Sequence, residues 1–304
     1  MVDEIADKPV FSNIELPISQ KIKLFDSLVG SILHFGSEIF GTYPCNDLEL
    51  VRTKFLRRIL YVKKSTNLSA LYGELGRVPL IVIRKIRMIK YWQKILKCSD
   101  DSLLKTLYTM LEVDIDRQYH TYRGNNWAFK VKSLLEECGL MYIWNNRYIA
   151  NVPVDTIRQR LYDMYYQQWY SDVNNSRRLS SYSLYKTDLK LESYLENVTV
   201  VKHRIALSKF RVSSHKLAIE TGRYYNIPND ERLCMFCNMR AVETEYHLLL
   251  VCPYYTSLRR KYLKPYFCRW PSLVKFKLLL STNSKSIQIN LAKYLFFAMR
   301  LRGN

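Results

Sequence analysis

Three cysteines and one histidine in the last third of the chain have the residue types and the spacing of metal ligands. Two residues separate Cys234 from Cys237, nine more precede His247, and a further four precede Cys252. Thiolate and imidazole are the ligands that tetrahedral zinc prefers, and a Cys-x-x-Cys pair can direct two sulfurs at one ion. We therefore predict that these four residues bind zinc. Because the chain supplies all four ligands, a structural ion is favoured over a catalytic one, which keeps a position open.

Different local elements must position the two ligand pairs. The first pair is expected on a small turn or hairpin, and the second pair on a helix that begins near Glu243. Residues five apart lie about 140° around an ideal helix, so this helix should unwind before Cys252, where Pro253 helps to stop it. The alternative is that the four side chains simply pack together, since free cysteine is among the most buried residue types.

The composition predicts a folded, strongly basic protein. The chain has 304 residues, of which 48% are hydrophobic, a formal net charge of +20 and a pI near 9.6. Such a surface attracts polyanions and releases their counterions on binding, so nucleic acid is the leading candidate partner. The alternative is a cationic face that is only solvated.

The cysteine pattern and the amino-terminal sequence bear on the compartment. Seven cysteines, four of them scattered, do not form a disulfide framework, which indicates a reducing, intracellular environment such as the nucleus or cytoplasm. The first ten residues, MVDEIADKPV, are acidic and lack an apolar core, and charged residues interrupt the longer apolar runs. We therefore predict neither secretion nor a membrane span.

Apolar periodicity predicts a mainly α-helical fold. Helices are expected over residues 21–41 and 48–60, and Gly73 and Gly76 are expected to mark a turn before another helix. On that helix Arg87, Lys90, Lys94 and Lys97 form a cationic stripe, which is interpreted either as a phosphate-tracking surface or as an ordinary solvated face.

The expected organisation is a polar segment over residues 1–20, a helical region over 21–170, a linker over 171–188 and a basic zinc-binding domain over 189–304. The linker is placed in the serine-rich segment because it lacks periodicity. Aromatic residues at 162–170 are interpreted as core rather than as stacking platforms. Residues 286–302 are amphipathic and are expected to dock as a last helix.

Basic residues concentrate around the predicted metal site. Residues 201–280 carry a net charge of +10, which favours nucleic-acid binding by a zinc-pinned module. His203 and His215 are given no role. Some of the basic residues just before the metal site could instead brace the module through acids such as Glu220. The predicted backbone contacts are Arg204, Lys209, Arg211, Lys216 and Arg223.

Several motifs, in order, resemble one known family. FGSEIFG at 35–41, YGELGRVPL at 72–80 and KHRIALSKFRVSSHKLAIETGRY at 202–224 precede the Cys-x-x-Cys, and Glu243, His247 and Cys252 with Pro253 follow it. This arrangement is similar to the region downstream of the polymerase palm in reverse transcriptases of non-LTR retrotransposons, especially jockey-like ones. The resemblance extends from about residue 20 to 265. It implies a thumb-like helical region, a zinc-stapled helical module and a role in handling nucleic acid during reverse transcription.

One departure from that family restricts the expected activity. A reverse transcriptase needs palm carboxylates that hold divalent ions, and the sequence has no Tyr-x-Asp-Asp motif. The adjacent Asp100 and Asp101 follow Ser99 and are interpreted as a helix start. The resemblance thus implies a fragment without polymerase activity of its own, which could act beside an intact polymerase encoded by the same element. The alternatives are a protein-interaction module with a structural zinc and a non-functional relic.

Overall fold

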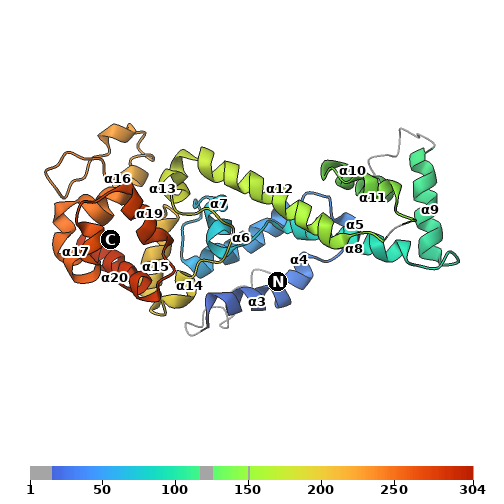
Figure 1. The fold of residues 1–304 in the computed structure, drawn as a ribbon, viewed down its shortest axis with the longest axis horizontal. Helices are drawn as coiled ribbons and strands as arrows, with labels where there is room; N and C mark the ends of the chain where they lie inside the picture. The colour runs from blue at the N-terminus through green and yellow to red at the C-terminus, as the bar shows by residue number, and fades with distance from the viewer. Residues whose placement is uncertain (1–15, 117–125, 150, 304) are drawn as a thin grey trace. The chain divides into compact units, whose positions relative to one another are not determined.

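The computed structural model describes residues 16–116, 126–149 and 151–303, and it confirms a mainly α-helical protein (Figure 1). Within these ranges the β-structure is limited to one isolated bridge between Leu233 and Val242. The described residues form two compact units. The first unit contains residues 16–25, 51–77 and 169–303, and the second contains 26–50, 78–116, 126–149 and 151–168.

The predicted linker over residues 171–188 is wrong. Helix α12 (Val154–Asn175) runs into this segment, and η1 (Arg177–Leu179) and α13 (Ser180–Ser183) follow it. Leu179 and Tyr182 have no exposed surface. The few apolar side chains of the segment are spaced to bury on one side, so the serines occupy the surface of a packed element and not a flexible connection.

The helix predicted over residues 21–41 is broken into α3 (Ile18–Leu28), most of which belongs to the first unit, and α4 (Gly30–Leu33) and α5 (Ser37–Phe40) of the second unit. Gly36 interrupts the last two with a φ of 65°, a conformation that glycine adopts without steric cost. Helix α5 packs against α8 (Leu80–Leu96). A Cβ on Gly41 would lie 2.7 Å from the carbonyl oxygen of Arg84, so only glycine allows this close approach.

The other helices of this part of the chain follow the predicted pattern. Helix α6 (Asn46–Leu60) covers the predicted 48–60, and α9 (Leu103–Asp116) begins after a turn that holds Asp100 and Asp101. The Ser102 hydroxyl caps α9 by accepting from the Lys105 amide at 3.2 Å. Helix α10 (Trp127–Glu137) and α11 (Met141–Asn145) are joined through Gly139, whose positive φ is typical of a glycine that ends a helix.

Helix α20 (Lys285–Leu301) is the central element of the first unit. It packs against α14 (Tyr194–Asn197), α15 (Val201–Arg211) and α17 (Thr256–Tyr262) (Figure 1). Leu291, Leu295 and Ala298 are buried, which confirms the predicted docking of the last helix. The remaining elements are α16 (Ala218–Thr221), η2 (Asn229–Glu231), η3 (His247–Val251), η4 (Pro253–Tyr255), α18 (Pro265–Cys268) and α19 (Leu273–Ser281).

Helix α7 (Leu68–Leu75) is buried in the first unit and does not form the predicted turn at Gly73. A Cβ on Gly73 would lie 2.4 Å from the Tyr182 hydroxyl and 3.0 Å from the Trp169 ring. The glycine is therefore required by packing. Gly76 ends the helix in the left-handed region, as a C-terminal glycine does.

A buried ion network fixes α7 to α15. The Arg211 guanidinium donates to both carboxylate oxygens of Glu74, at 2.8 and 2.9 Å, and pairs with Glu192 at 2.9 Å. The ring centroids of Tyr185 and Tyr194 lie 4.8 and 5.2 Å from the guanidinium carbon of Arg211. Because every polar atom here has a partner, the network gives the interior a specific arrangement.

The aromatic cluster at residues 162–170 is less buried than predicted. Trp169 is fully buried and donates from its indole nitrogen to the Ser69 carbonyl at 2.7 Å. Tyr166 and Tyr170 are 38% and 48% exposed. Tyr162 and Tyr165 are half-buried, so the core interpretation holds fully for Trp169 and is wrong for the exposed Tyr166 and Tyr170.

Candidate metal centre

The four predicted ligands converge on one point. One sulfur or nitrogen atom from each of Cys234, Cys237, His247 and Cys252 lies within 4.8 Å of the other three. The sulfurs of Cys234 and Cys252 are 3.9 Å apart, and the sulfur of Cys237 is 3.4 Å from Nε2 of His247. Metal–ligand bonds of about 2.3 Å to sulfur and 2.0–2.1 Å to nitrogen in a tetrahedron require edges of about 3.8 and 3.6 Å. The arrangement therefore has the size of a tetrahedral metal site.

A short hairpin positions the first pair of ligands, as predicted. The Cys234 amide donates to the Ala241 carbonyl at 2.9 Å, and the Glu243 amide donates to the Arg232 carbonyl at 2.9 Å. Arg240 enters the return arm with a φ of 50°. These bonds close a tight loop, so the two thiols of the Cys-x-x-Cys are held on the same side of it.

The second pair is held by a π-helix. The predicted helix begins at Glu245, and its residues His247–Val251 adopt the wider π form in place of the α form. The Cys252 amide donates to the His247 carbonyl at 2.7 Å, which closes the i to i+5 bond directly between the two ligand residues. In an α-helix the two side chains would diverge by about 140°. In the π-turn the two side chains reach the same site, at the position where the helix was predicted to unwind.

Arg259 supports the π-turn from α17. Its side chain is buried, and its guanidinium donates to the carbonyls of Leu248 and Cys252, the latter at 2.5 Å. The Tyr294 hydroxyl of α20 also donates to the Leu248 carbonyl, at 2.7 Å. These donors satisfy carbonyls that the wider helix leaves without an α-helical partner.

Burial sets the protonation state of the ligand side chains when no metal is bound. Burial raises the pKa of the Cys252 thiol to about 12, and burial also raises the pKa of the Cys234 thiol. Burial and then the charge of Arg259 lower the pKa of His247, so the imidazole is neutral at pH 7. Without a metal, the buried thiols are protonated. A metal ion must displace these protons and supply the charge that makes thiolates stable here.

The end of α20 joins the metal hairpin. Arg302 donates to the Glu243 carboxylate at 2.8 Å and to the Lys216 carbonyl at 2.9 Å, and its guanidinium lies 4.9 Å from the Phe236 ring centroid. Glu243 also accepts from the Ala218 amide at 2.7 Å. Sequence reasoning did not identify Arg259 or Arg302, because a basic residue on a helix gives no signal of which carbonyl or carboxylate it meets.

Two of the five basic residues predicted to contact the nucleic-acid backbone are buried, so the prediction is wrong for them. Arg211 is 2% exposed and forms the buried pair with Glu74. Arg204 is 8% exposed and donates to the Val198 carbonyl at 3.1 Å. Both lie on the inward side of α15, so neither guanidinium is available to a phosphate.

The other three lie at the surface. Lys216 is exposed and Lys209 is half-buried. Arg223 is exposed but pairs with Glu220 at 3.3 Å, which agrees with the alternative that Glu220 serves as a brace. The Glu220 carboxylate also pairs with the guanidinium of Arg178, at 3.2 Å.

The stripe predicted on α8 belongs to the second unit, whereas the four metal ligands belong to the first. Lys90, Lys94 and Lys97 are exposed, and Arg87 is half-buried and pairs with Glu38 at 3.4 Å. The predicted cationic stripe is therefore present on α8 in its three lysines.

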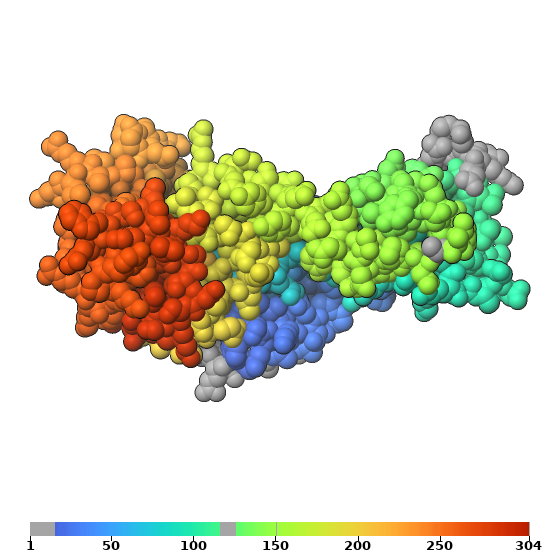
Figure 2. Space-filling model, in the orientation of Figure 1, coloured from blue at the N-terminus to red at the C-terminus, as the bar shows by residue number. Residues whose placement is uncertain are grey.

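Acids and bases are distributed differently around the metal centre. Residues 246–304 contain no Asp or Glu. Glu220, Glu243 and Glu245 are buried, and Glu245 accepts from Ser181 at 2.8 Å and contacts His215 at 3.0 Å. His215 is thus a core residue, as its lack of a predicted role implied. These three carboxylates face inward, whereas Asp230 and Glu231 are exposed. Figure 2 shows the segment from residue 240 onward in orange and red, and its exposed basic side chains include Arg240, Arg260, Lys261, Lys264, Arg269, Lys277, Lys285 and Arg300.

None of the described helices combines the length and the apolar character needed to cross a bilayer. We also compared the chain with protein-family models, with curated proteins and with solved structures, and no match was found in any of the three comparisons.

Proposed function

We propose that the first unit is a nucleic-acid-binding module whose basic segment is held by a structural zinc ion. Cys234, Cys237, His247 and Cys252 would hold the ion. Zinc is preferred over other metals because three thiolates and one imidazole at tetrahedral spacing are its typical structural ligand set. The ion would pin the hairpin to the π-turn and perform no chemistry.

One observation carries the nucleic-acid assignment: carboxylates in the segment after Ala218 are mostly buried in internal pairs, whereas most of its basic side chains are exposed. A positively charged surface on a rigid support can contact phosphates in a defined position without recognising individual bases. We therefore expect affinity for RNA and DNA with little sequence preference.

We further propose, on the motif resemblance, that the chain corresponds to the post-palm part of a non-LTR retrotransposon reverse transcriptase. The order of the motifs and the metal ligands after them support this proposal. In that role the chain binds nucleic acid and adds no nucleotides, and an intact polymerase of the same element is a candidate partner. A primer-extension assay tests this: templated incorporation that is lost in Asp100→Ala or Asp101→Ala would contradict it.

The decisive experiment for the proposed function is a binding titration at several salt concentrations. Fluorescently labelled RNA and DNA should bind with an affinity that falls steeply as salt rises, by about 0.7–0.9 decades per decade of salt for each phosphate contacted. No binding at low salt, by a folded and metal-loaded protein, would refute the assignment.

A second candidate function is a protein-interaction module. It is favoured by the exposed apolar side chains of the metal hairpin, where Met235 is 86% and Met239 53% exposed. Methionine is common at adaptable protein-binding surfaces. In this case Met235→Ser with Met239→Ser would leave nucleic-acid affinity unchanged and would abolish retention of a partner polymerase.

A further inference from the structure

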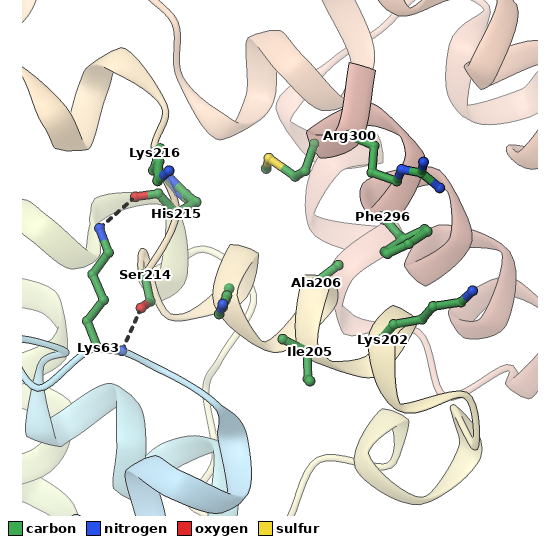
Figure 3. Close-up of a pocket in the computed structure, with 11 residues that line it drawn as sticks. Lys63, Lys202, Ile205, Ala206, Ser214, His215, Lys216, Phe296 and Arg300 are labelled. Carbon is green, nitrogen blue, oxygen red and sulfur yellow. Dashed lines mark hydrogen bonds between the residues drawn. The ribbon is translucent and has the colours of Figure 1, made fainter. Parts of the chain in front are cut away.

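A basic groove lies between α15, α20 and the turn at residues 213–216, entirely within the first unit (Figure 3). Its volume is about 390 Å³, within the range of about 300–1,000 Å³ typical of small-ligand sites. The two helices form it with matching faces. Positions 202, 205, 206 and 209 on α15 and 296, 299 and 300 on α20 follow the i, i+3, i+4 spacing of one helix side.

The floor of the groove is apolar and contains an aromatic ring. Ile205, Ala206, Phe296 and Met299 line it, and each is partly exposed. Figure 3 shows the Phe296 ring between Lys202 and Arg300. The ammonium of Lys202 lies 5.3 Å from the ring centroid and the guanidinium carbon of Arg300 lies 5.9 Å from it. A flat, apolar group placed on this ring would have a cation on either side.

The rim of the groove is cationic. Lys63, Lys202, Lys209, Lys216 and Arg300 line it, and no Asp or Glu of the described chain does. Lys63 is held in place because its amide donates to the Ser214 hydroxyl at 3.0 Å and its ammonium donates to the His215 carbonyl at 3.4 Å (Figure 3). The rim therefore complements a ligand with several negative charges.

We propose that the basic groove binds single-stranded nucleic acid, with one unstacked base on Phe296 and the neighbouring phosphates on the lysines and Arg300. This inference rests on the proposed nucleic-acid binding and assigns it a location. Aromatic stacking combined with a cationic track is the general means of binding a single strand. In a duplex the base faces are covered by neighbouring bases, so a ring at the bottom of a groove meets only a base that has left the stack.

The test compares groove variants with matched variants elsewhere in the same unit. Phe296→Leu removes the ring but keeps an apolar side chain, and its control is Phe297→Leu. Phe297 lies outside the groove lining, stacks on Tyr262 at 5.5 Å between ring centroids and meets the Phe296 ring edge-on at 5.3 Å, so this variant reports any effect of lost packing beside Phe296. The triple variant Lys202→Ala, Lys216→Ala, Arg300→Ala is matched by Lys264→Ala, Lys277→Ala, Lys285→Ala, which removes three exposed charges away from the groove. Metal content and thermal unfolding verify that each variant is folded.

The probes are an unstructured single strand of about 12 nucleotides, a duplex of the same sequence, and poly-glutamate of equal charge as competitor. Phe296→Leu should weaken single-strand binding at least about fivefold and leave duplex binding unchanged. The groove triple should reduce the salt slope for the single strand by about 2, at about 0.7 for each lost contact, and should weaken binding more than the distal triple does.

Three results would contradict single-strand binding in the groove without contradicting the proposed function. They are equal losses of affinity in the two triple variants, equal effects of Phe296→Leu on single-strand and duplex binding, and no effect of Phe296→Leu on either. Competition by poly-glutamate as strong as that by the oligonucleotide would instead indicate an acidic protein ligand. If the wild-type protein binds no nucleic acid at low salt, the proposed function itself fails.

Discussion

The guanidinium of Arg211 and the carboxylate of Glu74 form two parallel hydrogen bonds in the interior of the first unit, although 137 residues separate them in the sequence. Both side chains are buried, at 2% and 0% exposure. A charge in this position depends on its partner, because removal of one member leaves the other ionised without compensation.

We expect Arg211→Ala to lower the free energy of unfolding by about 3–5 kcal/mol. The matched change is Lys216→Ala on the exposed side of the same segment, which should alter stability by less than about 0.5 kcal/mol. Denaturant unfolding of the two variants makes the comparison. Equal, small effects would show that Arg211 is not part of the buried pair.

Acid should destabilise the first unit through its buried carboxylates. Burial is the largest single influence on the pKa of Glu74 and of Glu245 and opposes ionisation, but the polar partners of each carboxylate together outweigh it. The charge and hydrogen bonds of Arg211, with Lys186 and Tyr194, lower the pKa of Glu74, and His215 with Ser181 lowers the pKa of Glu245. A lowered folded-state pKa stabilises the fold above the usual glutamate value of 4.5 and ceases to do so as pH falls through the folded-state value.

The free energy of unfolding should therefore decrease as pH is lowered below 4.5. Glu243, whose pKa burial raises, acts in the opposite sense and at higher pH: its contribution to stability grows as pH falls from its folded-state pKa toward 4.5, above the range in which Glu74 and Glu245 act. Unfolding measured at stepped pH checks this. Glu74→Gln should flatten the dependence, whereas Glu231→Gln, which changes an exposed acid, should not.

The purified protein should contain one zinc ion per chain. Cys237→Ser should lose it, and Cys268→Ser, which changes a half-buried cysteine outside the ligand group, should retain it. Apparent zinc affinity should rise about 100-fold for each pH unit near neutrality, since at least the two buried thiols with raised pKa must release protons. Elemental analysis and competition with a chelator measure both. Full metal content in Cys237→Ser would contradict the ligand assignment.

Gly73→Ala should destabilise the first unit by about 1–3 kcal/mol, because the added methyl group would overlap the Tyr182 hydroxyl. Tyr182→Phe removes that oxygen, so the double variant should recover part of the loss. A double-mutant cycle in thermal unfolding gives the coupling. Strict additivity would place the cost in the contact with the Trp169 ring, 3.0 Å from the added methyl group, because alanine has a higher helix propensity than glycine.

The sequence was informative where local chemistry decides the structure. The four metal ligands, α6, α8 and α20 follow from spacing and periodicity alone. The burial of Arg204 and Arg211 could not be predicted, because both residues lie on a helix that has polar residues on every side. Their burial depends on Glu74 and Val198, which come from other parts of the chain.

Domain boundaries were poorly predictable for a related reason. Residues 16–25, 51–77 and 169–303 belong together, and the segments of the second unit, residues 26–50 and the described part of 78–168, alternate with them along the chain. A polar, serine-rich composition over 171–188 suggested a connection, yet Leu179 and Tyr182 are buried there. Composition averages over a segment, while packing is decided by the few apolar side chains within it.

The alternation of the two units along the chain also sets an order of events during synthesis. At about 5–20 residues per second, the 137 residues from Leu75 to Arg211 take roughly 7–27 s to be made. During that delay α7 has been made without the helix that neutralises its carboxylate, whereas all the segments of the second unit are already present by residue 168. The second unit can thus fold cotranslationally, whereas the burial of α7 must wait until α15 has been made.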